Sequence, residues 1–242
     1  LFVTGRCGRS CFYCPLSQER REQDLVFADE MRVEKISDIL EEARAIDALG
    51  TGITGGEPLA RLDYVLQCIR ALKAALGEKH HIHLYTGILP GRETMQRLQQ
   101  AGLDEIRFHP PLEQWTDSGP LTQALREAKS LGLLAGVEIP AIKEAPAIVQ
   151  AVRDADAFLN VNELEFSETN YAALAAEGFM PEELGCGALG SEDIARQHFL
   201  KEDIWAHYCP SRFKDAVQLR ERLLRRAGRT AQDGLLQRHS TR

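Results

Sequence analysis

The sequence lacks the features that would direct a protein into a membrane or an oxidising compartment. No run approaches the roughly 20 apolar residues that a membrane-spanning helix needs, and no charged and apolar leader opens the chain. Six cysteines among 242 residues are too few for a disulfide scaffold. Internal repeats and low-complexity segments are also missing. These absences predict a cytoplasmic protein without membrane contact.

Charge is unevenly spread along the chain. The net charge is -7, yet residues 207–242 hold nine Lys and Arg against three Asp and Glu. The acidic body excludes a general nucleic-acid coat, whereas a basic helix expected over residues 213–227 leaves a local RNA contact open. The same arginines can equally form a solvated face or neutralise the acidic body.

Short apolar runs alternate with amphipathic segments up to Leu164, which predicts repeated βα units and a parallel sheet. Strand-to-strand distances of roughly 25 to 30 residues suit one right-handed crossover each. Six units are too few for a closed eight-unit barrel, so the expected fold is α/β, an open partial (βα)6 barrel. The expected strands are residues 1–5, 51–54, 82–88, 105–109, 133–139 and 158–166.

The last third of the chain no longer alternates in this way. Residues 1–168 are therefore expected to form the barrel, and residues 169–242 a helical C-terminal extension with a basic tail. The stretch 230–242 is polar enough to be disordered. The helices expected from apolar spacing are residues 36–46, 62–76, 95–103, 121–131, 145–154, 171–178 and 213–227.

Three of the cysteines crowd into one short loop after the first expected strand. Cys7, Cys11 and Cys14 stand at spacings of four and three residues. Three thiolates can hold three irons of a [4Fe-4S] cluster, which leaves the fourth iron open for a substrate or cofactor. A zinc site completed by a distant residue is the alternative. Its conceivable fourth ligands are His81, His109 and Cys209.

The CxxxCxxC loop, with Tyr13 just before its last cysteine, resembles that of the radical S-adenosylmethionine (radical SAM) superfamily. A second segment, Gly55-Gly56-Glu57-Pro58, follows the second expected strand and is similar to the GGE motif of that superfamily. Two glycines let a backbone approach a ligand closely, and the carboxylate can accept hydrogen bonds from an ammonium group. The Cys-Phe-Tyr-Cys-Pro run looks nearest to the branch related to pyruvate formate-lyase-activating enzymes.

The resemblance implies an enzyme with two cofactors, a [4Fe-4S] cluster and SAM. An electron passed through the cluster would cleave SAM, and the resulting 5′-deoxyadenosyl radical would take a hydrogen atom from a substrate. The electron would come from a donor such as a flavodoxin or ferredoxin. The protein's share would be to align the substrate and to exclude water. The substrate is unknown, with peptide or protein modification ranked ahead of RNA modification and of small-molecule chemistry.

The resemblance also implies contacts to SAM at the ends of other strands. The Gly-Gly-Glu segment would receive the methionine amino group, and Thr86 resembles a position that relatives fill with Thr-Asn-Gly, although the Asn is missing here. Arg107 and His109 share a strand face and could meet the SAM carboxylate and the ribose or substrate. The plainer alternative for Arg107 is a rim salt bridge. Glu138 lies in a segment that resembles the adenine-lining strand of relatives.

Two further groups of residues remain open from the sequence. The polar end of the sixth expected strand is the best candidate for substrate contacts; it comprises Asn160, Asn162, Glu163, Glu165, Ser167, Glu168 and Asn170. Cys68 is expected to be a buried helix thiol. Cys186 and Cys209 could join His198 or His207 in a second metal site or supply catalytic thiols.

Two other functional classes stay open. The three cysteines could hold a structural or sensing metal in a non-catalytic module, which would be indifferent to SAM. The chain could also be an RNA-binding accessory protein that works through Arg220, Arg222, Arg225 and Arg226.

Overall fold

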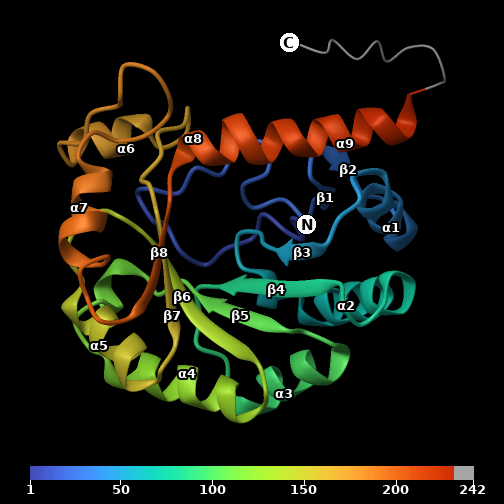
Figure 1. Ribbon diagram of the computed structural model, residues 1–242, viewed down its shortest axis with the longest axis horizontal. Coiled ribbons are helices and arrows are strands. Elements are labelled where there is room, and N and C mark those ends of the chain that lie inside the picture. The colour runs from blue at the N-terminus through green and yellow to red at the C-terminus, as the bar shows by residue number, and fades with distance from the viewer. Residues whose placement is uncertain (232–242) are drawn as a thin grey trace, which may run out of the picture.

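The computed structural model describes residues 1–231, and a curved parallel sheet forms its framework (Figure 1). Within these residues six strands pair in the order β3-β4-β5-β6-β7-β8, and every pair is parallel. A small antiparallel pair, β1 and β2, precedes them. The strands are β1 (Phe27–Ala28), β2 (Met31–Arg32), β3 (Gly50–Ile53), β4 (His81–Thr86), β5 (Glu105–Phe108), β6 (Leu134–Pro140), β7 (Phe158–Asn162) and β8 (Trp205–Cys209).

Helices connect successive strands and cover the convex face of the sheet (Figure 1). Each begins after a strand and carries apolar residues at helical spacing, so one side packs on the sheet while the other meets water. They are α1 (Ile36–Ala45), α2 (Leu62–Leu76), α3 (Arg92–Ala101), α4 (Gly119–Ser130) and α5 (Pro146–Asp154). Short 3-10 turns at Pro58–Arg61 and Leu112–Gln114 precede α2 and α4.

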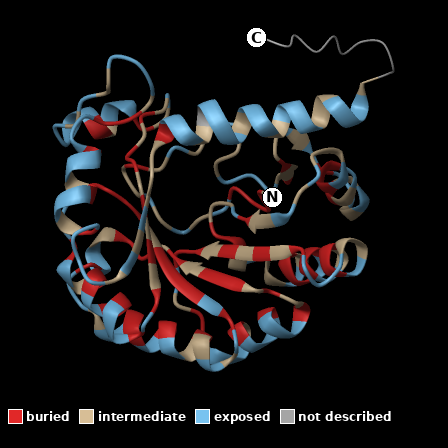
Figure 2. Ribbon diagram, viewed as in Figure 1, coloured by how far each residue is buried: buried red, intermediate tan, exposed pale blue. Residues whose placement is uncertain are grey.

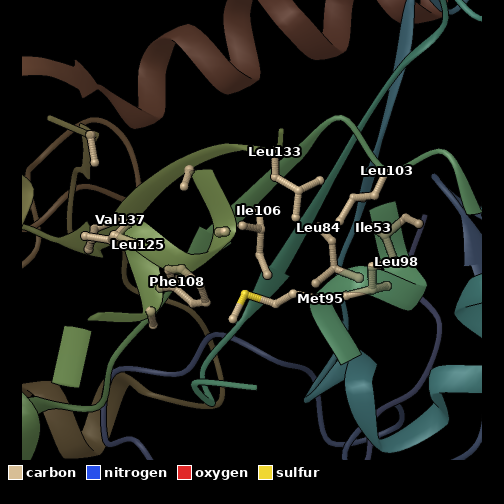
Figure 3. Packing of buried hydrophobic residues seen from close by; sticks show 14 of the residues in the cluster. Ile53, Leu84, Met95, Leu98, Leu103, Ile106, Phe108, Leu125, Leu133 and Val137 are labelled. Carbon is tan, nitrogen blue, oxygen red and sulfur yellow. The ribbon is translucent and has the colours of Figure 1, made fainter. Parts of the chain in front are cut away.

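The hydrophobic core lies between the sheet and these outer helices (Figure 2). In β4 the residues Ile82, Leu84 and Thr86 are buried, while the alternating residues face the concave side and are partly exposed. Figure 3 shows Ile53, Leu84 and Ile106 of adjacent strands packed with Met95 and Leu98 of α3. Because one face of each strand is committed to this core, the other face is free to line an interior.

The C-terminal part folds back across the open side of the sheet. It contains α6 (Tyr171–Ala176), α7 (Ser191–His198), α8 (Ser211–Phe213), a π-helical segment (Lys214–Leu219) and α9 (Arg220–Thr230). Residues 211–230, called the strap below, run above β1, β2 and α1 (Figure 1). None of the helices in residues 1–231 combines the length and the apolar character that crossing a bilayer would take.

Salt bridges hold the strap at both ends. Lys214 lies 2.6 Å from Glu165, and Arg222 lies 2.6 Å from Asp29. Further along α9, Arg226 pairs with the buried Glu42 of α1, and Arg229 with Asp47. Three arginines of α9, Arg222, Arg226 and Arg229, therefore pair with acidic residues of the body, which is one of the alternatives that the sequence left open.

Most of the expected elements are confirmed, and two expectations about strands need correction. Five expected strands became β3 to β7, but residues 1–5 form only isolated bridges, from Phe2 to Phe27 and Thr54. The sixth strand of the sheet is β8, which lies after residue 168 and was not expected. Helix α7 was missed as well. The expectation of disorder concerns residues 230–242, of which 232–242 lie outside the described residues.

Candidate active site

A cavity of about 470 Å³ opens at the carboxyl ends of the strands. This is the size range of small-molecule sites, and in parallel βα folds this edge carries the functional loops. The cavity brings together most of the residues singled out in the sequence, namely Cys7, Cys11, Tyr13, Cys14, Gly55, Gly56, Pro58, Thr86, His109 and Glu138. Glu57 and Arg107 lie just behind its wall.

The three cysteines of the loop are free thiols of intermediate burial. The loop turns tightly between Cys11 and Cys14, because the Cys14 amide donates to the Cys11 carbonyl over 3.1 Å. Burial raises the pKa of the Cys11 thiol, and a hydrogen bond with Tyr13 and the charge of Arg9 oppose that rise. The Cys11 thiol therefore needs an electropositive partner, such as iron, to become a thiolate.

The three thiols are not gathered as closely as the ligands of one metal ion would be. Two sulfurs on a tetrahedral zinc ion lie about 3.8 Å apart, given Zn–S bonds of roughly 2.3 Å. Among the described residues, the set whose ligand atoms lie within 4.8 Å of one another is His81, His83 and Glu105, not the three cysteines. Three thiols lining one cavity at wider spacing suit a cluster.

Gly55 and Gly56 allow the cysteine loop to pack against the end of β3. A Cβ at Gly56 would lie 2.4 Å from the Arg6 carbonyl oxygen, and one at Gly55 would lie 2.6 Å from that of Thr4. The Gly56 amide donates to Thr4 over 2.7 Å, and the Glu57 amide donates to Arg6 over 2.8 Å. The two motifs are thus joined through their backbones, and the glycines are needed for that contact.

The carboxylate of Glu57 is buried and fully engaged. One oxygen accepts from the Thr86 hydroxyl over 2.8 Å and from the Leu59 amide over 3.1 Å. The other accepts from Arg9 and from the Gly87 amide, each over 2.9 Å. Glu57 therefore ties the ends of β3 and β4 to the cysteine loop. Sequence reasoning missed Arg9, although a charged residue inside the cysteine spacing was a signal that it needs a partner.

Tyr13 and His109 line the same cavity and contact each other. The Nδ1 atom of His109 lies 2.7 Å from the Glu138 carbonyl oxygen, so Nδ1 carries the proton and donates. The Nε2 atom then accepts from the Tyr13 hydroxyl over 3.1 Å. Burial lowers the pKa of His109, which keeps the imidazole neutral and preserves this arrangement. Asn170 donates to the Tyr13 carbonyl over 3.0 Å from the other side. Both ends of Tyr13 are therefore fixed.

Arg107 is expected to meet a ligand carboxylate, and in the structure its guanidinium is engaged by protein groups. Its guanidinium pairs with Glu105 and donates to Glu138 over 2.8 Å and to the Tyr85 hydroxyl over 3.0 Å. Glu138 also accepts from Asn160 and Asn162. The plainer alternative, a salt bridge, describes Arg107 correctly, but the bridge lies inside the barrel rather than at its rim.

The mouth of the cavity is polar and reaches the strap. Asn162, Glu163, Glu165 and Lys214 line it, in agreement with the expectation that the end of the sixth expected strand faces a cavity. Ser167 and Asn170 are used instead to shape the turn beside Tyr13, since the Ser167 amide donates to the Asn170 side chain.

Comparison with known proteins identifies the class of protein to which the chain belongs. The model of the radical SAM superfamily matches residues 1–131. The chain therefore belongs to the radical SAM superfamily. It is an enzyme of the kind that uses a [4Fe-4S] cluster and SAM.

Individual relatives indicate the branch of the superfamily to which the chain is similar. A candidate glycyl-radical enzyme activating enzyme from Methanocaldococcus jannaschii is 38% identical over 98% of this chain and 68% of its own length. A PqqA peptide cyclase from Granulibacter bethesdensis is 29% identical over 62% of this chain and 35% of its own. The FeFe-hydrogenase maturase HydG from Carboxydothermus hydrogenoformans shares the fold, with a TM-score of 0.50, 15% identity and coverage of 70% of this chain and 45% of that one. The resemblance to the activating-enzyme branch is confirmed.

Proposed function

We propose that this enzyme abstracts a hydrogen atom from a protein or peptide substrate, with its cluster held by Cys7, Cys11 and Cys14. The observation that carries the proposal is that the three thiols and the Gly55–Pro58 segment line one cavity, with Tyr13 and His109 beside them. When bound, the cluster and SAM supply one-electron cleavage of the sulfonium, which ends in methionine and 5′-deoxyadenosine once the substrate has lost a hydrogen atom.

The side chains of the cavity have separable tasks in this proposal. Glu57 is fully occupied by protein donors. It therefore positions the loop, and backbone atoms of Gly55 and Gly56 are left to meet the SAM amino group. Thr86 acts through Glu57, to which its hydroxyl donates. Tyr13, held by the hydrogen bond from its hydroxyl to His109, would help to hold the nucleoside of bound SAM.

Glu138 supports the same wall from behind. Its carbonyl fixes the His109 ring, while its carboxylate accepts from Arg107, Asn160 and Asn162. Because the oxygens of Glu138 accept from three donors, its part is orientation. Water exclusion falls to the apolar cavity wall around Tyr13, Leu164 and Pro140.

A protein or peptide substrate is supported by the relatives, of which one is named for activating glycyl-radical enzymes and another for cyclising a peptide. The cavity mouth is polar as well, since Asn162, Glu165 and Lys214 line it, the last two paired with each other. An RNA substrate is less well supported, since Arg222 and Arg226 of the basic helix are paired with acidic residues.

Anaerobic reconstitution with iron and sulfide tests the proposal, followed by electron paramagnetic resonance of the reduced protein with and without SAM. We expect a [4Fe-4S]+ signal that changes when SAM is added, and slow release of 5′-deoxyadenosine. Each of Cys7→Ala, Cys11→Ala and Cys14→Ala should lose the signal, whereas Cys68→Ala in α2 should keep it. A colourless metal site, or a cluster whose spectrum ignores SAM, would contradict the proposal.

The substrate class needs its own measurement. With deuterated peptide or protein substrate, deuterium should appear in 5′-deoxyadenosine, and unlabelled RNA should not raise the rate of its formation. Stimulation by RNA alone would overturn the protein assignment while leaving the cofactor chemistry intact.

A further inference from the structure

A group of side chains of the kinds that bind metals lies at the opposite end of the strands from the cavity. His81 and Glu105 are the first residues of β4 and β5, and His83 follows two residues after His81. Because β4 and β5 are adjacent and parallel, with His83 paired to Glu105, these three side chains share the concave face of the sheet. We propose that His81, His83 and Glu105 bind one divalent transition-metal ion, for which Zn²⁺ is the best match.

The distances support a common ligand. One potential ligand atom from each of the three residues lies within 4.8 Å of the other two. His81 Nε2 and Glu105 Oε2 are 3.2 Å apart, close to the roughly 3.4 Å between nitrogen and oxygen ligands on a tetrahedral zinc ion. His81 is about two fifths exposed, whereas Glu105 is buried, so an ion can enter from solvent and be held at a buried carboxylate.

An ion pair between His81 and Glu105 would account for those two residues but not for His83. The Nδ1 atom of His83 is buried, and within residues 1–231 it has no hydrogen-bond partner. A buried polar atom without a partner is costly, so such an atom points to a ligand.

Arg107 completes the arrangement as a neighbour of the carboxylate. Its Nε atom donates to Glu105 Oε1, so the other oxygen, Oε2, is left on the side of His81. Hydrogen bonds of this kind orient ligating carboxylates in known metal sites. Glu138 shares the same guanidinium, and the group of Glu105, Glu138 and Arg107 therefore keeps a net negative charge that favours a cation.

The donor set indicates the class of ion. Two imidazoles and one carboxylate suit zinc and neighbouring first-row metals, and they leave a position for water. Calcium and magnesium prefer oxygen ligands only. The site joins β4 to β5 at the end of the strands away from the three cysteines, so its occupancy is independent of the iron-sulfur cluster and of the proposed function.

Metal content of the full chain tests the proposal. The cluster-loaded protein is exposed anaerobically to Zn²⁺, desalted and analysed by mass spectrometry for zinc per chain. We expect one zinc ion, retained at micromolar free metal. His81→Ala and His83→Ala should each weaken binding by about 100-fold or more, since each removes a ligand. His198→Ala is the matched control, because His198 lies in α7, away from the proposed zinc site, and this variant should bind one zinc ion.

Cobalt separates this site from the cysteines. In a Cys7→Ser, Cys11→Ser, Cys14→Ser variant, Co²⁺ should give visible ligand-field bands without the ultraviolet charge-transfer band of a thiolate. A thiolate band at equimolar Co²⁺, or zinc binding that neither histidine variant weakens, would overturn the assignment, and so would the absence of zinc from the wild-type protein. If His83→Ala does not fold, His81→Ala decides, because His81 is substantially exposed.

Discussion

Arg9 lies inside the cysteine loop, and its guanidinium is 2.9 Å from the carboxylate of Glu57 at the end of β3. Both side chains are largely shielded from water, which strengthens a charged hydrogen bond. Glu57 also accepts from Thr86 and Gly87 at the end of β4. One carboxylate therefore sets the position of the cluster loop relative to two strands.

Replacing that carboxylate by an amide should loosen the loop. In Glu57→Gln one oxygen becomes an NH2 group that faces the donors of Arg9 or Thr86, and we expect a loss of about 2 kcal/mol in the free energy of unfolding. Urea denaturation measures this change, and SAM titration of the cluster-loaded protein should show weaker binding. Asp63→Asn is the control, because Asp63 is exposed and pairs with Arg97 at the surface. Equal effects of the two variants would refute the positioning role.

A methyl group at Gly56 should separate the two motifs. The added Cβ would meet the Arg6 carbonyl at 2.4 Å, and backbone atoms there cannot yield without moving the cysteine loop. We expect Gly56→Ala to lower stability by about 1 to 3 kcal/mol and to reduce iron per chain after reconstitution. Gly91→Ala, whose Cβ meets nothing within 4 Å, should change neither quantity. Full iron content in Gly56→Ala would contradict this account.

How far the sequence predicts this site depends on the kind of contact. The cysteine spacing and the glycine pair are local patterns, and both motifs lie where they were expected. Two partners of Arg107, Tyr85 and Glu138, are not local. They follow from β5 lying between β4 and β6, which brings Tyr85 and Glu138 beside it. Strand alternation could predict that Arg107 faces the interior, but not that its guanidinium is already paired with two carboxylates.

The missed strand has a related explanation. Residues Trp205–Cys209 form a run of only five residues, in the part of the chain where strand-like and helix-like segments no longer alternate. Its strand conformation depends on pairing with β7, from Phe158 with Trp205 to Asn162 with Cys209. Such tertiary pairing overrides weak local preference.

The ion pair between α9 and α1 should contribute to stability. Arg226 contacts Glu42, whose side chain is only 4% exposed. Because removing the arginine leaves a buried carboxylate unpaired, we expect Arg226→Ala to cost about 2 kcal/mol in thermal unfolding. Arg220→Ala should cost less than about 0.5 kcal/mol, since Arg220 is exposed and pairs only with the adjacent Glu221. If Arg226→Ala unfolds like the wild type, the strap is not anchored there.

His109 should make stability depend on pH. Burial lowers the pKa of His109 in the folded chain below the usual 6.5. At pH values between the folded-state pKa and 6.5, the unfolded chain therefore binds a proton that the folded chain does not. Stability should therefore fall as the pH drops below about 6.5, by about 1 kcal/mol at pH 5.5 relative to pH 7.5. Urea unfolding of the cluster-free chain at both pH values measures this. In His109→Gln the difference between the two pH values should be smaller by that amount; an unchanged difference would show that other groups cause it.

The strap contacts have a kinetic consequence. Arg222 and Asp29 are 193 residues apart, so their pairing closes nearly the whole length of the chain. Contacts that close such long loops form late in folding and tend to break early in partial opening. The amides of α9 should therefore exchange with deuterium faster than those of β4 to β7. Release of the strap alone would uncover the cavity mouth at Lys214 while the sheet keeps its register. A macromolecular substrate could then reach the cavity without global unfolding of the enzyme.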